Sequence, residues 1–470
     1  MENFKQSINN STKIIATIGP STDSYDAVYK LIKNGVNGIR LNFSHASHDE
    51  HKNRIQWVRK ISKELNIPIA IIQDLQGPKI RLGDFDGSIN VQNNDILKFG
   101  YNTQYIKEGI IPIQYDLSQK VKKGERLYLY DGEIKTIIEG IENGIIFARA
   151  QNKGELVKRK GINLPDTDFN GDIITSKDLE DLKFGVLMEV DYIALSFVQR
   201  SDDIENLRQI LKKLNSNIKI ISKIETRAAV DNLEEIIKVS DAVMVARGDL
   251  AVETPPESVP IVQRRIVNLC LKYSKTSIIA TQMLFSMTDS PLPTRAEVSD
   301  IATAVIIGAD SVMLSDETAS GNYPIESVMM MQKVCSYTKE NSPLNVIFKD
   351  KKEKSLRNAI SSSVITLVEN INAKAIVVET KSGATALEIA DLKPIVPIIA
   401  VTDDILTYNQ LAIVSGVRSF LHPVDKLAAT KITDYLYEKK VFSKKDLIVT
   451  VSGDTPGEIG NTDTIKVRIL

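Results

Sequence analysis

Short apolar runs recur along the first two thirds of the chain and alternate with stretches that carry apolar residues at helical spacing. Each run is nearly continuous and rich in β-branched residues, which is typical of strands buried on both faces of a parallel sheet. The runs lie at 13–19, 38–44, 68–75, 192–198, 218–225, 242–250, 277–283 and 311–318. Eight strands alternating with helices predict an α/β fold, a closed (β/α)8 TIM barrel. An open doubly wound sheet is the alternative.

One interval interrupts this alternation, because more than 110 residues separate the third run from the fourth. The interval holds short segments of alternating polarity with Asp-Gly and Asn-Gly turns, which favour antiparallel strands. We predict an inserted small β domain at 78–165, entered through Gly77-Pro78 and left through KGINLPD. Two covalent connections at the mouth of a barrel would make it a hinged lid.

The pattern changes again after residue 340, where a polar connector leads into a helical segment and further apolar runs. The helical segment is SLRNAISSSVITLVENI, and the runs are AIVVET, IIAVT, SFLHPV, LIVTV and TIKVRIL. Together they predict a C-terminal α/β domain at 341–470. The barrel then comprises 1–77 and 166–340.

Composition narrows the possible partners and the compartment. A formal charge of −1 argues against bulk attraction to nucleic acid or to an anionic membrane. Cys270 and Cys335 lie in apolar helical stretches, which favours a reducing compartment without a disulfide framework. No apolar run approaches the ~20 residues that span a bilayer, and the polar N-terminal segment is unlike a signal peptide. We therefore expect a cytoplasmic protein.

Polar side chains gather at the predicted carboxyl ends of the strands, where a TIM barrel builds its active site. Because the fold brings these ends to one rim, we expect the side chains to meet there. They are Arg40, Asn42, Ser44, His45, Asp74, Lys223, Glu225, Arg247, Asp249, Thr281, Ser315 and Glu317.

The acidic members of this set point to a divalent cation. Glu225 ends the fifth strand and Asp249 the sixth, one inter-strand step of ~5 Å away, so that they could hold Mg²⁺ jointly. The alternative is a salt-bridge network with Lys223 and Arg247. The four histidines form no H-x-x-x-H pair, which argues against zinc.

The basic members point to an anionic ligand beside that cation. Arg40 and Lys223 would supply positive charge for a phosphate, and phosphoryl transfer needs mainly positioning and charge neutralisation. N–H groups in the turn GDLAVETPPE, with the hydroxyl of Thr281, could bind a carboxylate. The simpler alternatives are that Arg40 pairs with a neighbouring acid, that Thr281 packs in its strand, and that Ser315 is a small turn residue. The chain lacks the GxxxxGK[ST] P-loop.

Nine stretches along the chain together resemble the pyruvate kinase family. They are, in order, TKIIATIGP, IRLNFSH, QDLQGPKIR, KGINLP, ISKIET, VARGDLAVE, ATQML, PTRAEVSD and VMLSDETA. The resemblance covers nearly the whole chain and implies a glycolytic enzyme that depends on Mg²⁺ or Mn²⁺. It would transfer the phosphoryl group of phosphoenolpyruvate to ADP, giving pyruvate and ATP. It also implies the family's usual homotetramer.

The resemblance implies roles for individual residues. Glu225 and Asp249 match the Mg²⁺ ligands. Lys223 matches the lysine that stabilises the transferring phosphoryl group, and Arg40 the arginine on the substrate phosphate. Gly248, Asp249 and Thr281 match the cradle that binds the substrate carboxylate. Thr281 and Ser315 match positions linked to protonation of the enolate, with a water relay as the final donor. The matches to nucleotide contacts are Asn42, His45, Arg81 and Lys160.

The chain departs from the family pattern at four positions beside the site. Ala46 and Ala251 stand where Gly is common, Phe285 where Glu is usual, and Asp316 where Gly or Ala is usual. None replaces a named catalytic group, so we expect activity to be retained. Phe285 puts the polar support on the nucleotide side in question.

The stretch QDLQGPKIR differs from the D-T-K-G-P-E of K⁺-dependent relatives and resembles a K⁺-independent branch. Asn42, Ser44, Asp74 and Leu75 match the K⁺ ligands and would form a vestigial or facultative site. The ammonium of Lys79 near the rim could supply the positive charge that K⁺ would otherwise bring. We therefore predict activity without a monovalent cation.

In the C-terminal domain, ETKSGATALEIA resembles the family's effector-phosphate loop. Thr380, Ser382, Gly383 and Thr385 place hydroxyl and N–H groups at a helix N-terminus, which suits a phosphate, although a plain N-cap turn is the alternative. The late loop SGDTPGEIGNTDT has no Trp or Arg, unlike the family's fructose-1,6-bisphosphate site. A monophosphorylated sugar or AMP is therefore the expected effector.

Two functions from other classes are weighed against this one. A metal-dependent lyase or aldolase acting on pyruvate-like substrates would use the same Glu/Asp pair, but Lys223, Arg81 and the lid argue against it. A phosphometabolite sensor with a decayed site is opposed by the intact set of Arg40, Lys223, Glu225, Asp249 and Thr281.

Overall fold

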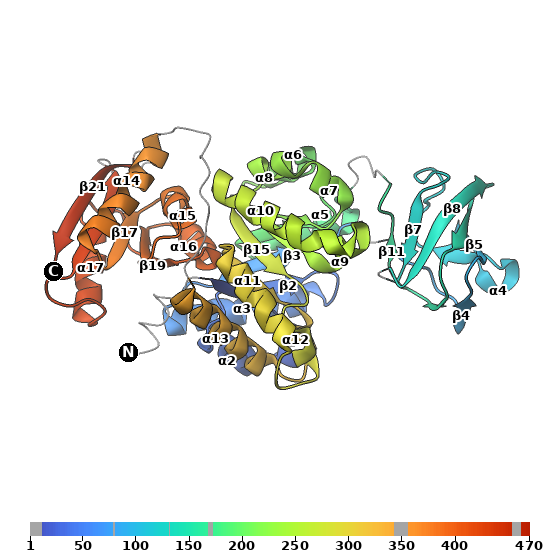
Figure 1. Cartoon of the computed structure of the whole chain (residues 1–470), viewed down its shortest axis with the longest axis horizontal. Helices are drawn as coiled ribbons and strands as arrows, with labels where there is room; N and C mark the ends of the chain where they lie inside the picture. The colour runs from blue at the N-terminus through green and yellow to red at the C-terminus, as the bar shows by residue number, and fades with distance from the viewer. Residues whose placement is uncertain (1–11, 79, 131, 168–172, 343–355, 454–461) are drawn as a thin grey trace.

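Eight parallel strands close into a barrel at the centre of the molecule (Figure 1). The computed structural model describes residues 12–78, 80–130, 132–167, 173–342, 356–453 and 462–470. The barrel strands are β1 (Lys13–Thr17), β2 (Gly38–Asn42), β3 (Ala70–Asp74), β12 (Tyr192–Leu195), β13 (Lys219–Ile224), β14 (Ala242–Ala246), β15 (Thr276–Ala280) and β16 (Ser311–Leu314). β12 pairs with β3, so the barrel resumes directly after the inserted segment. The closed ring confirms the TIM barrel over the open sheet.

Helices pack around the outside of the barrel, and local sequence sets where they begin. At the start of α3, Ser47 Oγ accepts from the N–H of Glu50, and the Glu50 carboxylate accepts from the N–H of Ser47. This capping box satisfies two N–H groups that a helix otherwise leaves unpaired. The helices are α2 (Tyr25–Lys33), α3 (His48–Leu65), α5 (Ser176–Leu187), α6 (Ser201–Lys213), α7 (Arg227–Asp231), α8 (Leu233–Val239), α9 (Arg247–Glu253), α10 (Val259–Tyr273), α11 (Arg295–Ile306), α12 (Asp316–Ala319) and α13 (Pro324–Asn341).

All eight barrel strands end earlier than the apolar runs predict, four of them by three or four residues. β12, β14, β15 and β16 end before the polar residues that the predicted strands included. The chain turns at the rim instead, and after β14 and β16 it enters the short helices α9 and α12 at once. The polar residues therefore lie in rim turns and first helical turns.

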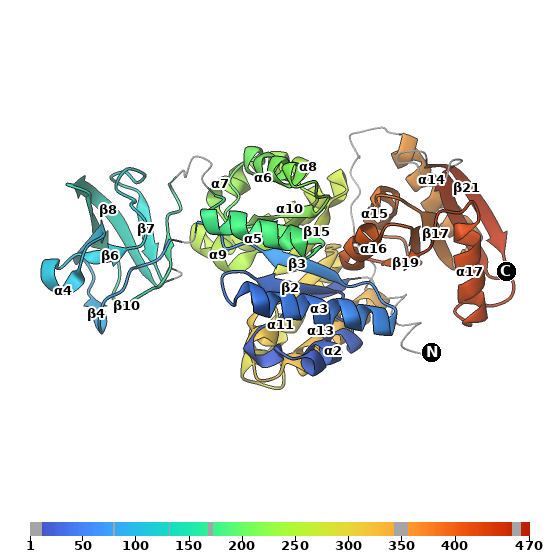
Figure 2. The ribbon, with the colours of Figure 1, turned by 180° about the vertical axis from the view of Figure 1, so that it is seen from behind.

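The inserted segment between β3 and β12 forms two small β-sheets with their own apolar core. Asn143 and Gly144 form the turn between β8 and β9 with φ of 49° and 79°, the left-handed geometry that tight hairpins need. Figures 1 and 2 show this inserted module to one side of the barrel. Its elements are β4 (Ser88–Val91), β5 (Ile96–Tyr101), α4 (Tyr105–Glu108), β6 (Ile111–Ile113), β7 (Arg126–Leu129), β8 (Ile134–Glu142), β9 (Ile145–Ala150), β10 (Gly154–Val157) and β11 (Ile162–Asn163).

A five-stranded sheet in the order β19-β18-β17-β20-β21 forms the C-terminal α/β unit. The first four strands are parallel, and β21 is antiparallel to β20. The elements are α14 (Leu356–Ile371), β17 (Ala375–Glu379), α15 (Ala384–Asp391), β18 (Ile398–Thr402), α16 (Ile405–Gln410), β19 (Val417–Leu421), α17 (Ala428–Glu438), β20 (Leu447–Gly453) and β21 (Thr462–Ile469). The sheet and its helices agree with the fold predicted for this part of the chain.

The C-terminal unit closes the amino-terminal end of the barrel. Ala412 and Ile413, from the 3-10 helix η4 (Leu411–Ile413), join the apolar cluster formed by inward-facing barrel residues. Tyr192 Oη, at the start of β12, donates to Gln410 O at 2.9 Å. The barrel interior therefore continues into the C-terminal unit.

Within the ranges that the structure describes, no helix is long and apolar enough to cross a membrane. Cys270 in α10 and Cys335 in α13 are buried, and neither forms a disulfide.

Candidate active site

Four charged side chains form a connected cluster at the carboxyl ends of β2, β3 and β13. Arg40 Nε donates to Asp74 Oδ2 at 2.6 Å. Lys223 Nζ lies 3.3 Å from Asp74 Oδ1 and 3.3 Å from Glu225 Oε2. All four side chains are largely buried. Arg40 therefore pairs with a neighbouring acid, Asp74, as its simpler alternative predicts. Through Asp74 it is also connected to Lys223 and Glu225.

One ammonium serves two buried carboxylates in this cluster. Burial alone would lower the pKa of Lys223, but Asp74 and Glu225 raise it, so the side chain stays protonated. Burial would raise the pKa of Asp74, yet Lys223 and Arg40 together hold it below its usual range. Burial raises the pKa of Glu225, Lys223 opposes the rise, and the nearby Asp249 carboxylate adds to it.

The acidic groups fit a divalent cation. Glu225 Oε1 accepts from the N–H of Phe197 at 2.6 Å, whereas Oε2 is buried and accepts no hydrogen bond. Within the described ranges, Arg40 and Lys223 pair with Asp74 and Glu225, and Asp249 adds a third carboxylate nearby, so Mg²⁺ would neutralise the remaining negative charge. Among the described residues, no group of three or more His, Cys, Asp and Glu side chains could hold a metal ion. Substrate and water oxygens would have to complete the shell.

The turn after β15 has a backbone conformation that β-branched residues rarely adopt. Thr281 has a φ of 69° and Gln282 a φ of 52°. Thr281 Oγ1 accepts from the N–H of Gly248 at 2.9 Å and donates to Ala280 O at 2.7 Å. The hydroxyl therefore points to the first turn of α9, and Thr281 does not pack as an ordinary strand residue.

Arg247 supports this turn and takes no part in the acidic pair. Its guanidinium donates to Thr281 O at 2.6 Å and to Ala280 O at 3.2 Å, and it pairs with Asp300 at 2.5 Å. The salt-bridge alternative is therefore right for Lys223, which pairs with Glu225, and wrong for Arg247.

Two further polar residues hold the rim together. Ser196, directly after β12, accepts from Lys223 Nζ at 2.7 Å and donates to Leu75 O at 2.7 Å. The carboxylate of Glu317 accepts from the N–H groups of Leu284 (2.9 Å) and Ser315 (2.7 Å). Sequence reasoning places Glu317 at the rim without a role and passes over Ser196, although both follow strand ends.

The residues matched to nucleotide contacts fall into two groups. Asn42 ends β2 and His45 follows in the next turn, where Asn42 Oδ1 accepts from the N–H of Ser44 at 3.1 Å. Arg81 and Lys160 lie on the paired connections of the inserted module, where the N–H of Leu82 donates to Lys160 O at 2.9 Å. The structure brings Arg81 and Lys160 together where the two connections of the module pair.

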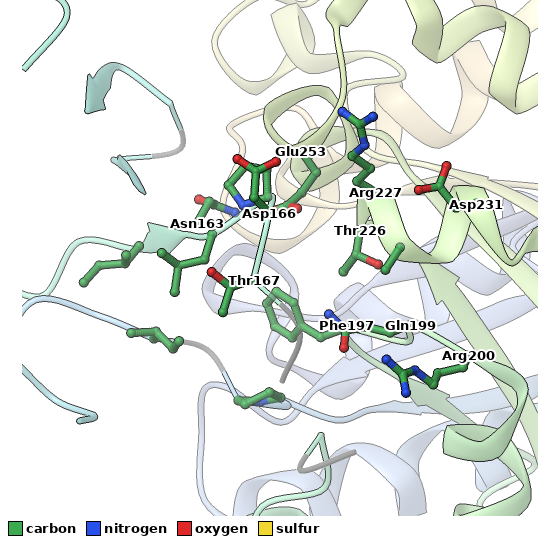
Figure 3. A pocket seen from close by; sticks show the side chains of 16 residues that line it. Asn163, Asp166, Thr167, Phe197, Gln199, Arg200, Thr226, Arg227, Asp231 and Glu253 are labelled. Carbon is green, nitrogen blue, oxygen red and sulfur yellow. The ribbon is translucent and has the colours of Figure 1, made fainter. Parts of the chain in front are cut away.

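A cavity of about 400 Å³ lies where the inserted module joins the barrel (Figure 3). Both connecting segments line it, with Pro78 and Ile80 from the first and Asn163 from the second. On the barrel side Glu253 is buried, and burial raises its pKa to about 7. Sequence reasoning passes over Glu253, because an acid near a Pro-Pro turn has the pattern of a solvated residue.

Two family models match nearly the whole chain. The model described as the pyruvate kinase barrel domain matches residues 9–328, and the model of the pyruvate kinase alpha/beta domain matches residues 358–468. The chain belongs to the pyruvate kinase family.

Individual pyruvate kinases agree with this assignment. Pyruvate kinase 2 from Synechocystis sp. is 39% identical over 98% of this chain and 79% of its own length. The Staphylococcus haemolyticus pyruvate kinase is 42% identical over 98% of this chain and 80% of its own length. The crystal structure of a pyruvate kinase from Cryptosporidium parvum superposes with a TM-score of 0.91 at 31% identity, covering 100% of this chain and 99% of that one.

The four departures from the pyruvate kinase pattern have different surroundings. Ala46, at a common glycine position, has a φ of 66°, in the left-handed region that favours glycine. Phe285 opens the 3-10 helix η3 (Phe285–Thr288) and is 50% exposed. Asp316 is exposed at the start of α12, and Ala251 is half-buried in α9. Nothing in the structure explains the acid at 316 or the alanine at 251.

The loop matched to the effector site forms a compact turn before α15. The N–H of Gly383 donates to Thr380 Oγ1 at 3.0 Å, and Gly383 has a φ of 81°. Thr385 Oγ1 lies 2.8 Å from Thr462 Oγ1, and Ser382, directly before Gly383, is half-buried. Most of the late loop lies outside the described residues, as does Lys79.

Proposed function

We propose that this member of the pyruvate kinase family transfers the phosphoryl group of phosphoenolpyruvate to ADP, giving pyruvate and ATP in glycolysis. The observation that carries the proposal is the buried cluster of Arg40, Asp74, Lys223 and Glu225 at one rim of the barrel. A protonated lysine held between two carboxylates is preorganised to meet the charge of a transferring phosphoryl group.

Each step would use a different part of the rim. Arg40 and Lys223 bind the phosphate as its bond to the enol oxygen breaks and a bond to the β-phosphate of ADP forms. The N–H groups of Gly248 and Asp249, with the hydroxyl of Thr281, hold the carboxylate of the substrate. Thr281 and Ser315 then guide a proton from water to the enolate carbon.

Glu225 and Asp249 would hold Mg²⁺ or Mn²⁺ in this proposal. Glu225 Oε2 supports that assignment, because it is buried, accepts no hydrogen bond and lies 3.3 Å from the ammonium of Lys223. When bound, the divalent cation would neutralise charge on the substrate oxygens.

The division into barrel, inserted lid at 78–165 and C-terminal domain at 341–470 belongs to the same proposal. Closure of the lid would carry Arg81 and Lys160 toward a nucleotide bound near Asn42 and His45. The pairing of the two lid connections supports a common movement of Arg81 and Lys160.

We further propose that the enzyme needs no K⁺. Lys79 would supply the positive charge, and Asn42, Ser44, Asp74 and Leu75 would form a vestigial K⁺ site. The carbonyl of Leu75 already accepts from Ser196 Oγ, which supports the view that this oxygen needs no cation.

The remaining proposals concern regulation and assembly. A phosphorylated sugar or AMP would bind at Thr380, Ser382, Gly383 and Thr385, and the active form would be a cytoplasmic homotetramer. Tight calorimetric binding of fructose-1,6-bisphosphate would count against the effector assignment.

One coupled assay tests the central proposal. Purified protein with phosphoenolpyruvate, ADP and Mg²⁺ should produce pyruvate, and replacing K⁺ by a tetraalkylammonium ion should leave the rate within about twofold. Absence of pyruvate would refute the reaction, whereas strict dependence on K⁺ would refute only the role of Lys79.

A further inference from the structure

The short helix α9 connects the proposed metal site to the inserted module. Asp249 lies in its first turn, and Glu253 ends the helix with only 7% of its surface exposed. Residues four apart share one face of a helix, so the two carboxylates lie along the same side of α9. One end of the helix therefore reaches Glu225, and the other reaches the hinge.

Glu253 joins three segments at that end. It lines the hinge cavity together with Asn163 and Arg227, and interactions with the Asn163 side chain and the Arg227 backbone oppose the larger effect of burial on its pKa. Asn163 belongs to β11, which leads out of the inserted module and pairs with β7. Arg227 begins α7, two residues after Glu225. Figure 3 shows Asn163 and Glu253 close together at the edge of the hinge cavity.

A second contact links the same helix to the module. A Cβ on Gly132, in the turn between β7 and β8, would lie 3.3 Å from Val252 Cγ1. The last turn of α9 therefore meets the module at two neighbouring residues. Burying a carboxylate costs free energy, so an apolar side chain at position 253 would fill the hinge with a smaller free-energy cost. Packing alone does not explain a glutamate here.

We propose that Glu253 is a positioning residue that couples the orientation of the inserted module to the arrangement of Glu225 and Asp249. The proposal rests on the function proposed above, in which these two carboxylates hold the metal. A movement of β11 displaces Asn163, and Glu253 passes the displacement along α9 to Asp249 and through Arg227 to Glu225. Closure of the module over a nucleotide then tightens the metal site.

The test combines metal binding without substrates and steady-state kinetics on the full-length protein. Mn²⁺ titration followed by electron paramagnetic resonance should show Kd raised about tenfold in Glu253→Ala and in Asn163→Ala, the loss typical of groups that orient metal ligands. The double variant should be no weaker than Glu253→Ala, because both changes break one link. Glu253→Gln keeps an acceptor for the Arg227 N–H and should recover part of the loss.

Kinetics separate positioning from a general loss of stability. At saturating Mg²⁺ the KM for ADP should rise in Asn163→Ala, while the KM for phosphoenolpyruvate should change less than twofold, since the proposed nucleotide contacts Arg81 and Lys160 lie on the module. Glu257→Gln is the matched control, because Glu257 is exposed in the 3-10 helix that follows α9. It should behave as the wild type in both measurements.

Three outcomes would overturn the coupling: an unchanged Mn²⁺ Kd in both Asn163→Ala and Glu253→Gln, additive losses in the double variant, or equal losses in Glu257→Gln. If Glu253→Ala does not fold, Asn163→Ala and Glu253→Gln still decide the question. If the wild type binds Mn²⁺ but forms no pyruvate, the proposed function fails, and the titration still reports whether the hinge controls the metal site.

Discussion

Replacing Lys223 by methionine removes one positive charge from the rim with little change in side-chain length. The ammonium contacts Ser196 Oγ at 2.7 Å and lies 3.3 Å from both Asp74 Oδ1 and Glu225 Oε2. Loss of a preorganised charge stabiliser of this kind costs about 3–4 kcal/mol in the transition state, or roughly 10²–10³ in kcat. We expect a loss of that size or more.

The same substitution also leaves two buried carboxylates without their shared partner. Removing one member of a buried pair typically destabilises a protein by about 3–5 kcal/mol. We therefore expect a lower unfolding midpoint alongside the lower kcat, with part of the stability regained at acidic pH, where the two acids are protonated.

The assay is pyruvate formation at saturating phosphoenolpyruvate, ADP and Mg²⁺, with circular dichroism to confirm folding. Lys219→Met is the matched control, because Lys219 begins the same strand at the opposite end of the barrel. It should keep kcat within about twofold. A folded Lys223→Met protein with near-normal kcat would refute the assigned role.

Three further outcomes follow from the structure. Ala46→Gly should raise the free energy of unfolding by up to about 1 kcal/mol in urea denaturation, because position 46 has a left-handed backbone, whereas Ala302→Gly within α11 should lower it by a similar amount. Burial lowers the pKa of Lys13 to about 7 from an unfolded value near 10.5, so the unfolded chain binds the extra proton between these pH values and stability should rise with pH. Lys13→Met should flatten that slope, by up to about 5 kcal/mol in total. Ile413→Ala should destabilise the barrel by about 2–5 kcal/mol, seen as an earlier fluorescence transition of Trp57 in α3, and a shift confined to the C-terminal unit would contradict the shared core.

The sequence was sufficient to predict the barrel, because strands that are buried on both faces appear as nearly continuous apolar runs. It also placed Lys223 and Glu225 on one rim, since residues two apart on a strand share a face. The pattern overran the end of every barrel strand, most at β12, β14, β15 and β16, because apolar residues continue into the turns and helices that follow.

The missed features depend on contacts between distant parts of the chain. Glu253 has the local sequence of an exposed acid, yet it is buried at a cavity that Asn163 of β11 also lines. Thr281 has a left-handed backbone, which β-branched residues rarely adopt. The guanidinium of Arg247 donates to the carbonyl of this residue. The partner of Arg247, Asp300, lies 53 residues further along the chain, a separation that no local pattern reports.

The floor of the barrel has a consequence for building chimeric enzymes. Ala412 and Ile413 complete a core whose other members come from the barrel strands, so the C-terminal unit is not an independent cassette. Exchanging the C-terminal unit between relatives would also exchange two side chains of the apolar core inside the barrel. A functional chimera would therefore have to carry the inward-facing residues at the strand starts, such as Tyr192, together with η4.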